Sequence, residues 1–196
     1  MYLYYMQNND QELNVINPNS LPLRSQSTVL SKKKVIDMIR KYDFYDADKN
    51  PEGKGFLHSY IIQVKNGNKI VIDAETNLMW QRSGTTYKIE SGDAKNCTKE
   101  LNRKGYAGYD DWRLPTLEEA MSLIERESSN GRLHINSMFD KKQNWIWTSD
   151  SYKKDSYKNG AQAWYVSFLR GICCNMHLFN YGYDHLRAVR SLQSSR

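Results

Sequence analysis

Two cysteines and two histidines lie close together near the end of the chain, and these residue types can carry chemistry. Cys173, Cys174, His177 and His185 fall within one short stretch. Thiolates and imidazoles are zinc ligands, and a thiolate of low pKa can act as a nucleophile. Adjacent residues on a strand point to opposite faces, so Cys173 and Cys174 cannot both bind one metal ion from a regular strand. The stretch therefore predicts one inward and one outward cysteine, and no metal site.

The signatures of the common catalytic classes are absent from the sequence: it has no GxSxG, no HExxH and no glycine-rich phosphate loop. His58 and His134 complete a set of four histidines, and no spacing among the four favours a catalytic triad. Residues 46–50 (DADKN) begin like a calcium loop, but Pro51 stands where the turn needs glycine, and Leu57 where a bidentate glutamate is needed. We predict no catalytic residue, no metal and no cofactor, and hence a protein that is not an enzyme.

The stretch from Gly171 to His185 (GICCNMHLFNYGYDH) has instead the composition of a binding surface. It is rich in aromatic and small polar residues and lacks Lys, Glu and Gln. Tyrosine offers a rigid amphipathic contact area at low entropic cost, and small polar residues adapt to a partner. The predicted ligand-binding residues are Cys173, Asn175, His177, Phe179, Tyr181, Tyr183 and His185.

Which of these side chains face outward depends on the strand register of a predicted hairpin. A two-residue turn at positions 170 and 171 would place alternate residues of its two strands on one face, and a one-residue shift would reverse the faces. The residues that would share a face are Cys173, Asn175, His177, Trp164, Val166 and Phe168. Both registers remain open at the level of sequence.

The elements that must position this surface are a mixture of helices and strands. Thr116 and Glu119 form a capping box that starts a helix, and Ser31 and Ser91 are caps for two others. Glycine at position 105 ends the helix that begins at Ser91. The inward faces are predicted to carry Val35, Met38, Ile39 and Tyr42; Ala94, Cys97 and Leu101; and Leu117, Ala120, Met121 and Ile124. The predicted strands are Tyr60–Val64, Ile70–Asp73, Leu78–Gln81, Ala163–Leu169, Ile172–Leu178 and Leu186–Ser191, with a tight turn at Asn66-Gly67.

Large aromatic residues and arginines are predicted to hold these elements together. Buried aromatic side chains supply much apolar area to a core. Arginines in apolar surroundings usually pair with carboxylates, for which Asp111, Glu118 and Asp73 are the candidates. The residues predicted to be structural are Trp80, Trp112, Arg113, Trp147, Trp164, Arg187 and Arg190.

Composition and charge restrict the function classes. The net charge of +6 could favour nucleic acid or an anionic glycan. The basic residues are scattered, however, and the one run, Lys32-Lys33-Lys34, lies at a predicted helix start. We interpret this run as a solvated surface and predict no binding of nucleic acid. The sequence shows no apolar run of membrane-spanning length and no leader pattern. The odd number of cysteines and the adjacent pair Cys173-Cys174 argue against a disulfide framework. These features predict a cytoplasmic protein without membrane contact.

Several motifs occur in an order that resembles one family. Asp111 to Glu119 contains DWRLPT; it follows Asp73 to Gln81 (DAETNLMWQ) and precedes Trp147-Thr148-Ser149, Ala163-Trp164 and Arg187-Ala188-Val189-Arg190. This order resembles the C-terminal domain of the collagen-like adhesin Lcl, a domain of unknown function. The resemblance implies a C-type-lectin-like fold, similar to that of formylglycine-generating enzymes. It further implies that a diversity-generating retroelement could vary the C-terminal segment for ligand contact.

The sequence thus predicts an α+β protein: a C-type-lectin-like domain at residues 59–196, with a small twisted antiparallel sheet, two main helices and long loops, after a helical N-terminal extension at 1–58. The expected function is non-catalytic recognition of a protein or glycan through the C-terminal hairpin. One alternative is a redox enzyme of the formylglycine-generating type with Cys173 or Cys174 as nucleophile, although adjacent cysteines do not match the spacing of that family. Another is an interaction subunit that joins a larger assembly through residues 1–27, because the patch Tyr2–Met6 is too apolar for a free tail.

Overall fold

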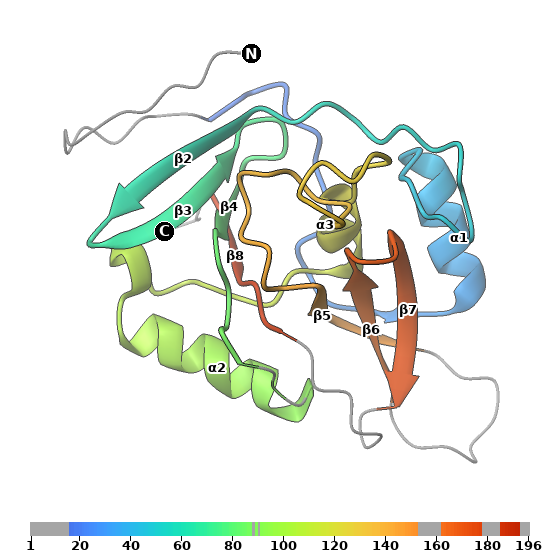
Figure 1. The fold of residues 1–196 in the computed structure, drawn as a ribbon. Coiled ribbons are helices and arrows are strands. Elements are labelled where there is room, and N and C mark those ends of the chain that lie inside the picture. Colours follow the sequence, from blue (N-terminus) through green and yellow to red (C-terminus); the bar gives the residue numbers. More distant parts are fainter. Residues whose placement is uncertain (1–15, 88, 90, 153–161, 178–184, 193–196) are drawn as a thin grey trace.

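The computed structural model describes residues 16–87, 89, 91–152, 162–177 and 185–192. Within them the chain forms two four-stranded sheets, three α-helices and one short 3-10 helix (Figure 1). The elements are β1 (Val29–Leu30), α1 (Lys32–Lys41), β2 (Tyr60–Lys65), β3 (Asn68–Asp73), β4 (Leu78–Gln81), α2 (Ser91–Arg103), η1 (Tyr106–Gly108), α3 (Leu117–Ser122), β5 (Trp145–Tyr152), β6 (Gln162–Ser167), β7 (Ile172–His177) and β8 (Val189–Ser191). The α+β class is confirmed, whereas the prediction of a single small sheet is wrong.

The first sheet has the order β2-β3-β4-β8 and is antiparallel throughout. Asn66 and Gly67 form the predicted turn between β2 and β3, and both have positive φ, at 50° and 73°. This conformation matches the right-handed twist of the two strands. Helix α2 lies along this sheet and buries Ala94 in the same cluster as Ile70 (Figure 1).

The second sheet has the order β1-β5-β6-β7, in which β1 runs parallel to β5. The loop between β6 and β7 has four residues, 168–171, rather than the two that we considered. The extra two residues leave the faces unchanged, because side chains alternate with a period of two. Val166 therefore lies opposite Cys173 and Trp164 opposite Asn175, on one face of the sheet.

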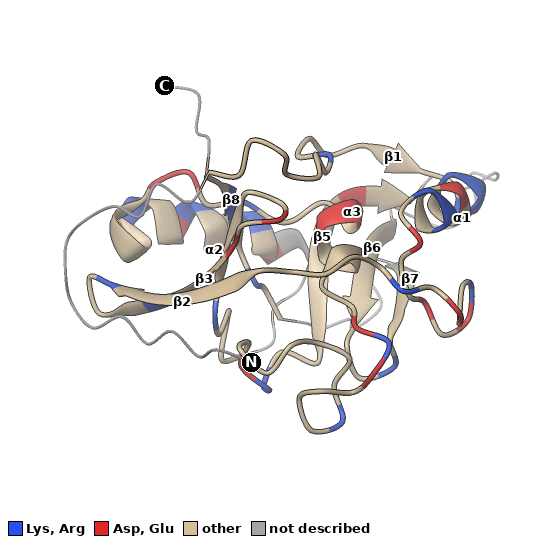
Figure 2. Cartoon of the chain, turned by 90° about the horizontal axis from the view of Figure 1, so that it is seen from above, with Lys and Arg blue, Asp and Glu red and all other residues tan. Residues whose placement is uncertain are grey.

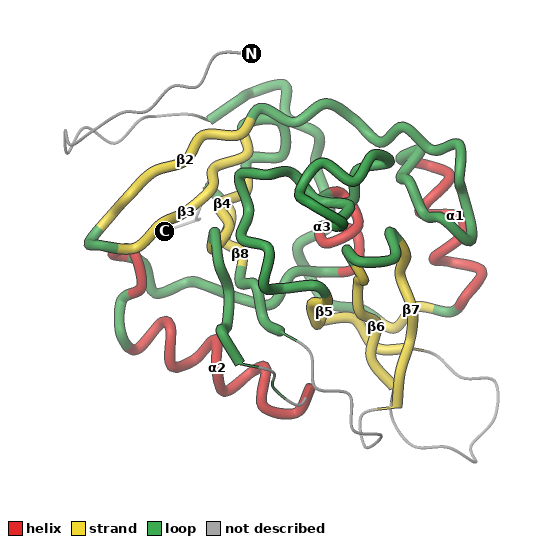
Figure 3. Tube along the Cα trace, in the orientation of Figure 1, coloured by secondary structure: helices red, strands yellow, loops and turns green. Residues whose placement is uncertain are grey.

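The N-terminal extension packs into the same core as the rest of the chain. Val35 and Ile39 of α1 are fully buried in one cluster with Trp80 and Trp164. The core thus crosses the boundary that we predicted at residues 58 and 59. Long loops at 42–59 and 123–144 connect the two sheets and complete this body (Figure 3).

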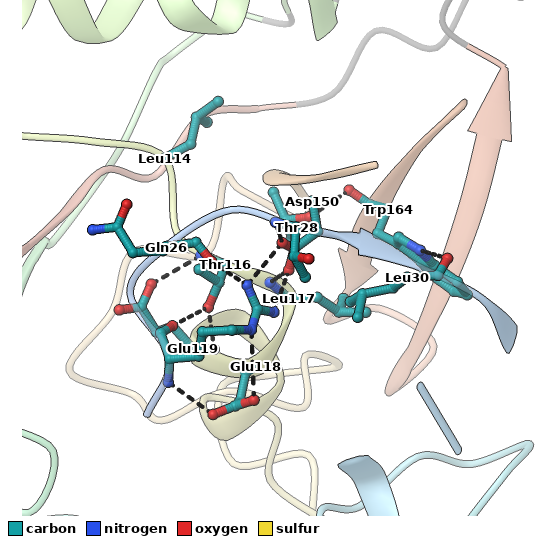
Figure 4. Close-up of polar contacts among 12 residues, drawn as sticks. Gln26, Thr28, Leu30, Leu114, Thr116, Leu117, Glu118, Glu119, Asp150 and Trp164 are labelled. Carbon is teal, nitrogen blue, oxygen red and sulfur yellow. Dashed lines mark hydrogen bonds and ion pairs between the residues drawn. The ribbon is translucent and has the colours of Figure 1, made fainter. Parts of the chain in front are cut away.

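The segment before β1 is tied to the rest of the body by a buried carboxylate. Asp150, whose side chain is fully buried, accepts hydrogen bonds from Arg24, from the backbone N–H of Thr28 and from that of Leu117 (Figure 4). The hydroxyl of Thr116 donates to the carbonyl of Arg24 at 2.7 Å. Residues 24–28 of the predicted arm therefore form part of the folded body, whereas residues 1–15, including the patch Tyr2–Met6, lie outside the described residues.

The capping box at the start of α3 is confirmed. The Thr116 hydroxyl accepts from the Glu119 N–H at 3.2 Å, and the Glu119 carboxylate accepts from the Thr116 N–H at 2.8 Å. The helix is shorter than predicted, since it ends at Ser122, and all six of its residues are buried. Helix α2 runs as predicted, and Gly105 follows it with a left-handed φ of 60°.

The arginines are pinned, but not by all the partners that we predicted. Arg113 forms a bidentate pair with Glu119, at 2.7 Å for both contacts, and Arg190 pairs with the predicted Asp111. Asp73 instead accepts from His58, whose other ring nitrogen contacts the Ser122 carbonyl oxygen at 2.7 Å.

Arg187 has no carboxylate partner among the described residues. Its guanidinium lies over the Phe139 ring and bonds the side chain of Gln143 and the carbonyl of Asp140. Burial lowers the pKa of Arg187 to about 9. Arg187 therefore does not pair directly with any of the three candidate carboxylates, although the charge of the Asp140 carboxylate also acts on it. No helix in the described part of the chain combines the length and the apolar character that a bilayer crossing requires.

Candidate functional site

The structure divides the predicted ligand-binding residues into three groups. Phe179, Tyr181 and Tyr183 lie outside the described residues, and so does the side chain of His177. Cys173 and His185 are buried. Asn175 is half-buried at the edge of the second sheet.

Burial removes Cys173 and His185 from the predicted ligand surface. Cys173 is 0% exposed and lies beside Val166 on the sheet face that packs into the core, and burial raises the pKa of its thiol. His185 is 8% exposed, and its Nδ1 atom contacts the carbonyl oxygen of Thr85 at 3.0 Å. Its backbone exchanges hydrogen bonds with Trp145 and Trp147. Both residues hold the hairpin and its neighbours in place.

A groove lies beside Asn175, between β7 and α1. Its volume is about 280 Å³. The hairpin supplies one wall, and α1 and the loop after it supply the other. The lining residues are Lys32, Ile36, Lys49, Trp164, Cys173, Cys174 and Asn175. We call this feature the β7 groove.

The loop after α1 closes one end of the β7 groove. The buried carboxylate of Asp46 accepts from the Cys173 N–H at 2.9 Å and from the Lys49 N–H at 2.9 Å. The Lys49 ammonium lies 3.2 Å from the same carboxylate and donates to the Cys173 carbonyl at 2.8 Å. The backbone edge of β7 is thus covered at Cys173, and Asn175 is the next residue that points its backbone to the same side.

Positive charge lies at the end of the groove that Lys32 lines. Lys32, Lys33 and Lys34 form the first turn of α1, where Figure 2 shows a concentration of basic residues. Lys33 pairs with Asp37 at 2.7 Å. Lys32 and Lys34 form no ion pair with a described residue. The N-terminus of a helix also carries partial positive charge, so this end of the groove favours an acidic ligand.

Three lining residues, Lys32, Ile36 and Lys49, were missed from the sequence. The spacing of Lys32 and Ile36 places them on one helix face. That pattern indicates a shared face but gives no partner, because its place in the same groove as Asn175 depends on how α1 packs against a distant hairpin. We had interpreted the lysine run only as a solvated surface.

The described residues do not form an obvious reactive centre. Cys173 is enclosed, and the ring nitrogens of His58 are occupied by Asp73 and the carbonyl of Ser122. In the same part of the chain, no three His, Cys, Asp or Glu side chains come together in a way that could hold a metal ion.

The cysteines give a direct test of the redox alternative. We expect Cys173 to react with a neutral aromatic disulfide such as DTNB at pH 8 only as fast as the protein opens, because its thiol is buried and its pKa is raised. The Cys173→Ala variant identifies the slow thiol, and denaturant should release it. Rapid modification of Cys173 in the folded protein would contradict the buried geometry and revive the nucleophile hypothesis.

The comparisons with known proteins agree with the motif order. The family model of the Lcl C-terminal domain matches residues 69–190. No curated protein and no solved structure matches the chain. Because the matched region spans more than half of the chain, from β3 to β8, this protein belongs to the Lcl C-terminal domain family.

Proposed function

We propose that the chain is a non-catalytic recognition module that binds a protein or glycan ligand at the β7 groove and the adjoining surface of its C-terminal hairpin. The observation that supports this function is the groove itself, in which Asn175 of the predicted stretch lies opposite Lys32 and Ile36. A rigid scaffold that presents a binding surface beside variable loops is a common arrangement in recognition domains. The C-type-lectin-like arrangement that the family resemblance implies is part of this proposal.

The charge at the groove favours an acidic ligand. Lys32 lines the groove, and Lys34 stands on the same helical turn without lining it. Basic groups at the rim of a site attract acidic ligands and increase the association rate. An acidic protein segment and an anionic glycan both meet this requirement.

Burial limits where retroelement diversification could act. Ile172, Cys173 and His185 are each less than a tenth exposed. Random substitution at such positions costs about 2–4 kcal/mol or creates an unsatisfied polar group. If the segment is varied, Cys174 and Asn175 are the described positions that tolerate change, since both are half-buried and line the groove.

The two alternatives draw less support. A redox enzyme would need an accessible thiolate. Cys173 is enclosed, so of the two candidate nucleophiles only Cys174, which is half-buried and lines the groove, could serve. A docking role for the whole arm 1–27 conflicts with the contacts that its second half makes within the chain, since the Leu21 N–H donates to the Glu75 carbonyl and Arg24 pairs with Asp150.

The groove assignment predicts a difference between two matched charge reversals. Lys32→Glu should weaken binding to immobilised poly-glutamate or to heparin by about tenfold, because it places a negative charge inside the site. Lys34→Glu changes the net charge equally, lies in the same helical turn and should change affinity by less than about threefold. Biolayer interferometry at physiological salt would measure both. Equal effects of the two variants would show that the attraction comes from net charge alone and would contradict the site.

A further inference from the structure

Among the described residues, the edge of β7 has an unpaired position at Asn175, which follows from the backbone pattern of the strand. In an antiparallel strand, alternate residues point their N–H and C=O groups toward the neighbouring strand or away from it. Cys173 points both groups away from β6, because its N–H donates to Asp46 and its C=O accepts from Lys49. The opposite strand agrees with this assignment: the carbonyl of Trp164 accepts from Thr148 of β5, on the side away from β7.

Asn175 follows with the same orientation. Its N–H and C=O must point away from β6, and neither group bonds to a described residue outside the sheet. Its side chain, by contrast, is engaged, since Nδ2 donates to Gln162 at 2.6 Å. An edge strand with free backbone groups is a template for pairing with another extended chain.

We propose that the β7 groove binds an extended acidic peptide segment that adds to the edge of β7 at Asn175 as a further, antiparallel strand. This inference rests on the proposed recognition function and specifies its ligand. The segment's residue opposite Asn175 would donate its N–H to the Asn175 carbonyl and accept from the Asn175 N–H. Main-chain bonds of this kind supply affinity, and alternate side chains supply specificity.

The geometry determines which side chains of the segment must be acidic. A residue that pairs directly with Asn175 carries its side chain on the same face of the sheet, and this face opens into the groove beside Lys32 and Ile36. Lys32 forms no ion pair with a described residue, so a carboxylate on that face supplies its counter-charge. Residues one position away point to the opposite face and need no charge. The segment therefore alternates acidic and neutral residues.

A synthetic probe tests both the backbone and the charge requirement. The probe is a fluorescein-labelled heptapeptide in which Thr and Glu alternate, and its binding is followed by fluorescence anisotropy. N-methylation of the Glu residues should weaken binding at least about tenfold, because these N–H groups face β7. N-methylation of the Thr residues should change affinity by less than about threefold, because those N–H groups face away. An alternating Thr and Lys peptide should not bind.

Two substitutions test the edge from the side of the protein. Asn175→Pro removes the outward N–H and leaves the backbone bonds to β6 in place, and it should abolish binding of the Thr–Glu probe; its side-chain bond to Gln162 is lost in the alanine variant as well. Asn175→Ala keeps the backbone donor and should retain binding within about threefold. Thermal unfolding of both variants establishes that the fold is intact.

The outcomes separate the inference from the function on which it rests. If both N-methylated probes bind equally, or if only heparin binds and does so in a Lys32-dependent manner, the added strand is overturned while recognition at the groove stands. If neither the peptide nor heparin distinguishes Lys32→Glu from Lys34→Glu, the proposed function fails as well.

Discussion

Replacement of Asp150 by alanine should lower the free energy of unfolding by about 3–5 kcal/mol, among the largest effects that a single charge deletion produces. The Asp150 side chain is fully buried and binds both terminal nitrogens of Arg24, at 2.9 Å and 2.7 Å. It also accepts from the N–H groups of Thr28 and Leu117, each at 2.7 Å. Alanine leaves the guanidinium and two backbone donors without this acceptor.

The loss should be largest in the segment that Asp150 ties down. Arg24 and Thr28 belong to the segment before β1, and Leu117 is the first residue of α3. The carboxylate of Asp150 therefore joins this segment and α3 to its own strand, β5 (Figure 4). Urea unfolding measures the change in free energy. Limited proteolysis should show faster cleavage between residues 16 and 28 than elsewhere, because local opening follows the loss of local contacts.

Asp37 provides the matched control for this deletion. It also forms an ion pair, with Lys33 at 2.7 Å, but both side chains are more than half exposed. Exposed pairs of this kind contribute little, so Asp37→Ala should change stability by less than about 1 kcal/mol. Similar losses for the two variants would mean that Asp150 is not the junction that the contacts indicate.

Local signals explain what could be predicted of the fold. The capping box of Thr116 and Glu119, the Asn66-Gly67 turn and the glycine after α2 each depend on residues within a few positions of one another. Interactions of such short range are specified by the residue types alone. The helices and most strands were therefore found, although α3 ends before Ile124 and β8 begins at Val189 rather than at Leu186.

Strand β5 was missed because side chains on both of its faces are buried. Trp145 and Trp147 pack in one cluster with Tyr165, while Ile146 of the same strand packs in the other cluster with Val166. A strand enclosed on both faces loses the alternation of apolar and polar residues that indicates a half-buried strand. The second sheet was consequently not recognised, and its parallel β1–β5 pair had no local signal at all.

Partners distant in sequence were predicted less well. Arg113 and Arg190 both pair with carboxylates. Glu119, held at the start of α3 by the capping box, pairs with Arg113, whereas the candidate Glu118 accepts from the Arg24 N–H and the Tyr42 hydroxyl. The β7 groove also depends on packing between residues that are distant in sequence. Asn175 was named from composition, whereas Lys32 and Lys49 entered only through the packing of α1 and its loop against β7.

Asp46 is the second residue at which a large effect is expected, and here stability and the proposed site are coupled. Its carboxylate is fully buried and accepts from the N–H groups of Asp48, Lys49 and Cys173. Lys49 supplies the neighbouring cation, at 3.2 Å. The stretch that begins like a calcium loop thus uses its first carboxylate to fasten β7.

Asp46→Ala should cost about 2–4 kcal/mol, because it leaves a half-buried ammonium and several donors unsatisfied. The Cys173 amide should exchange with solvent about tenfold faster or more, since its outward bond is lost. The affinity for the Thr–Glu peptide should also fall, because Lys49 and the backbone of β7 at Cys173 lose the carboxylate that holds them in place. Asp48→Ala is the control. That side chain is more than half exposed and lies 3.9 Å from Arg170, and the substitution leaves the backbone bond from residue 48 to Asp46 intact. If Asp46→Ala destabilised the protein but left both the Cys173 exchange rate and the affinity unchanged, the loop would support the core without shaping the groove.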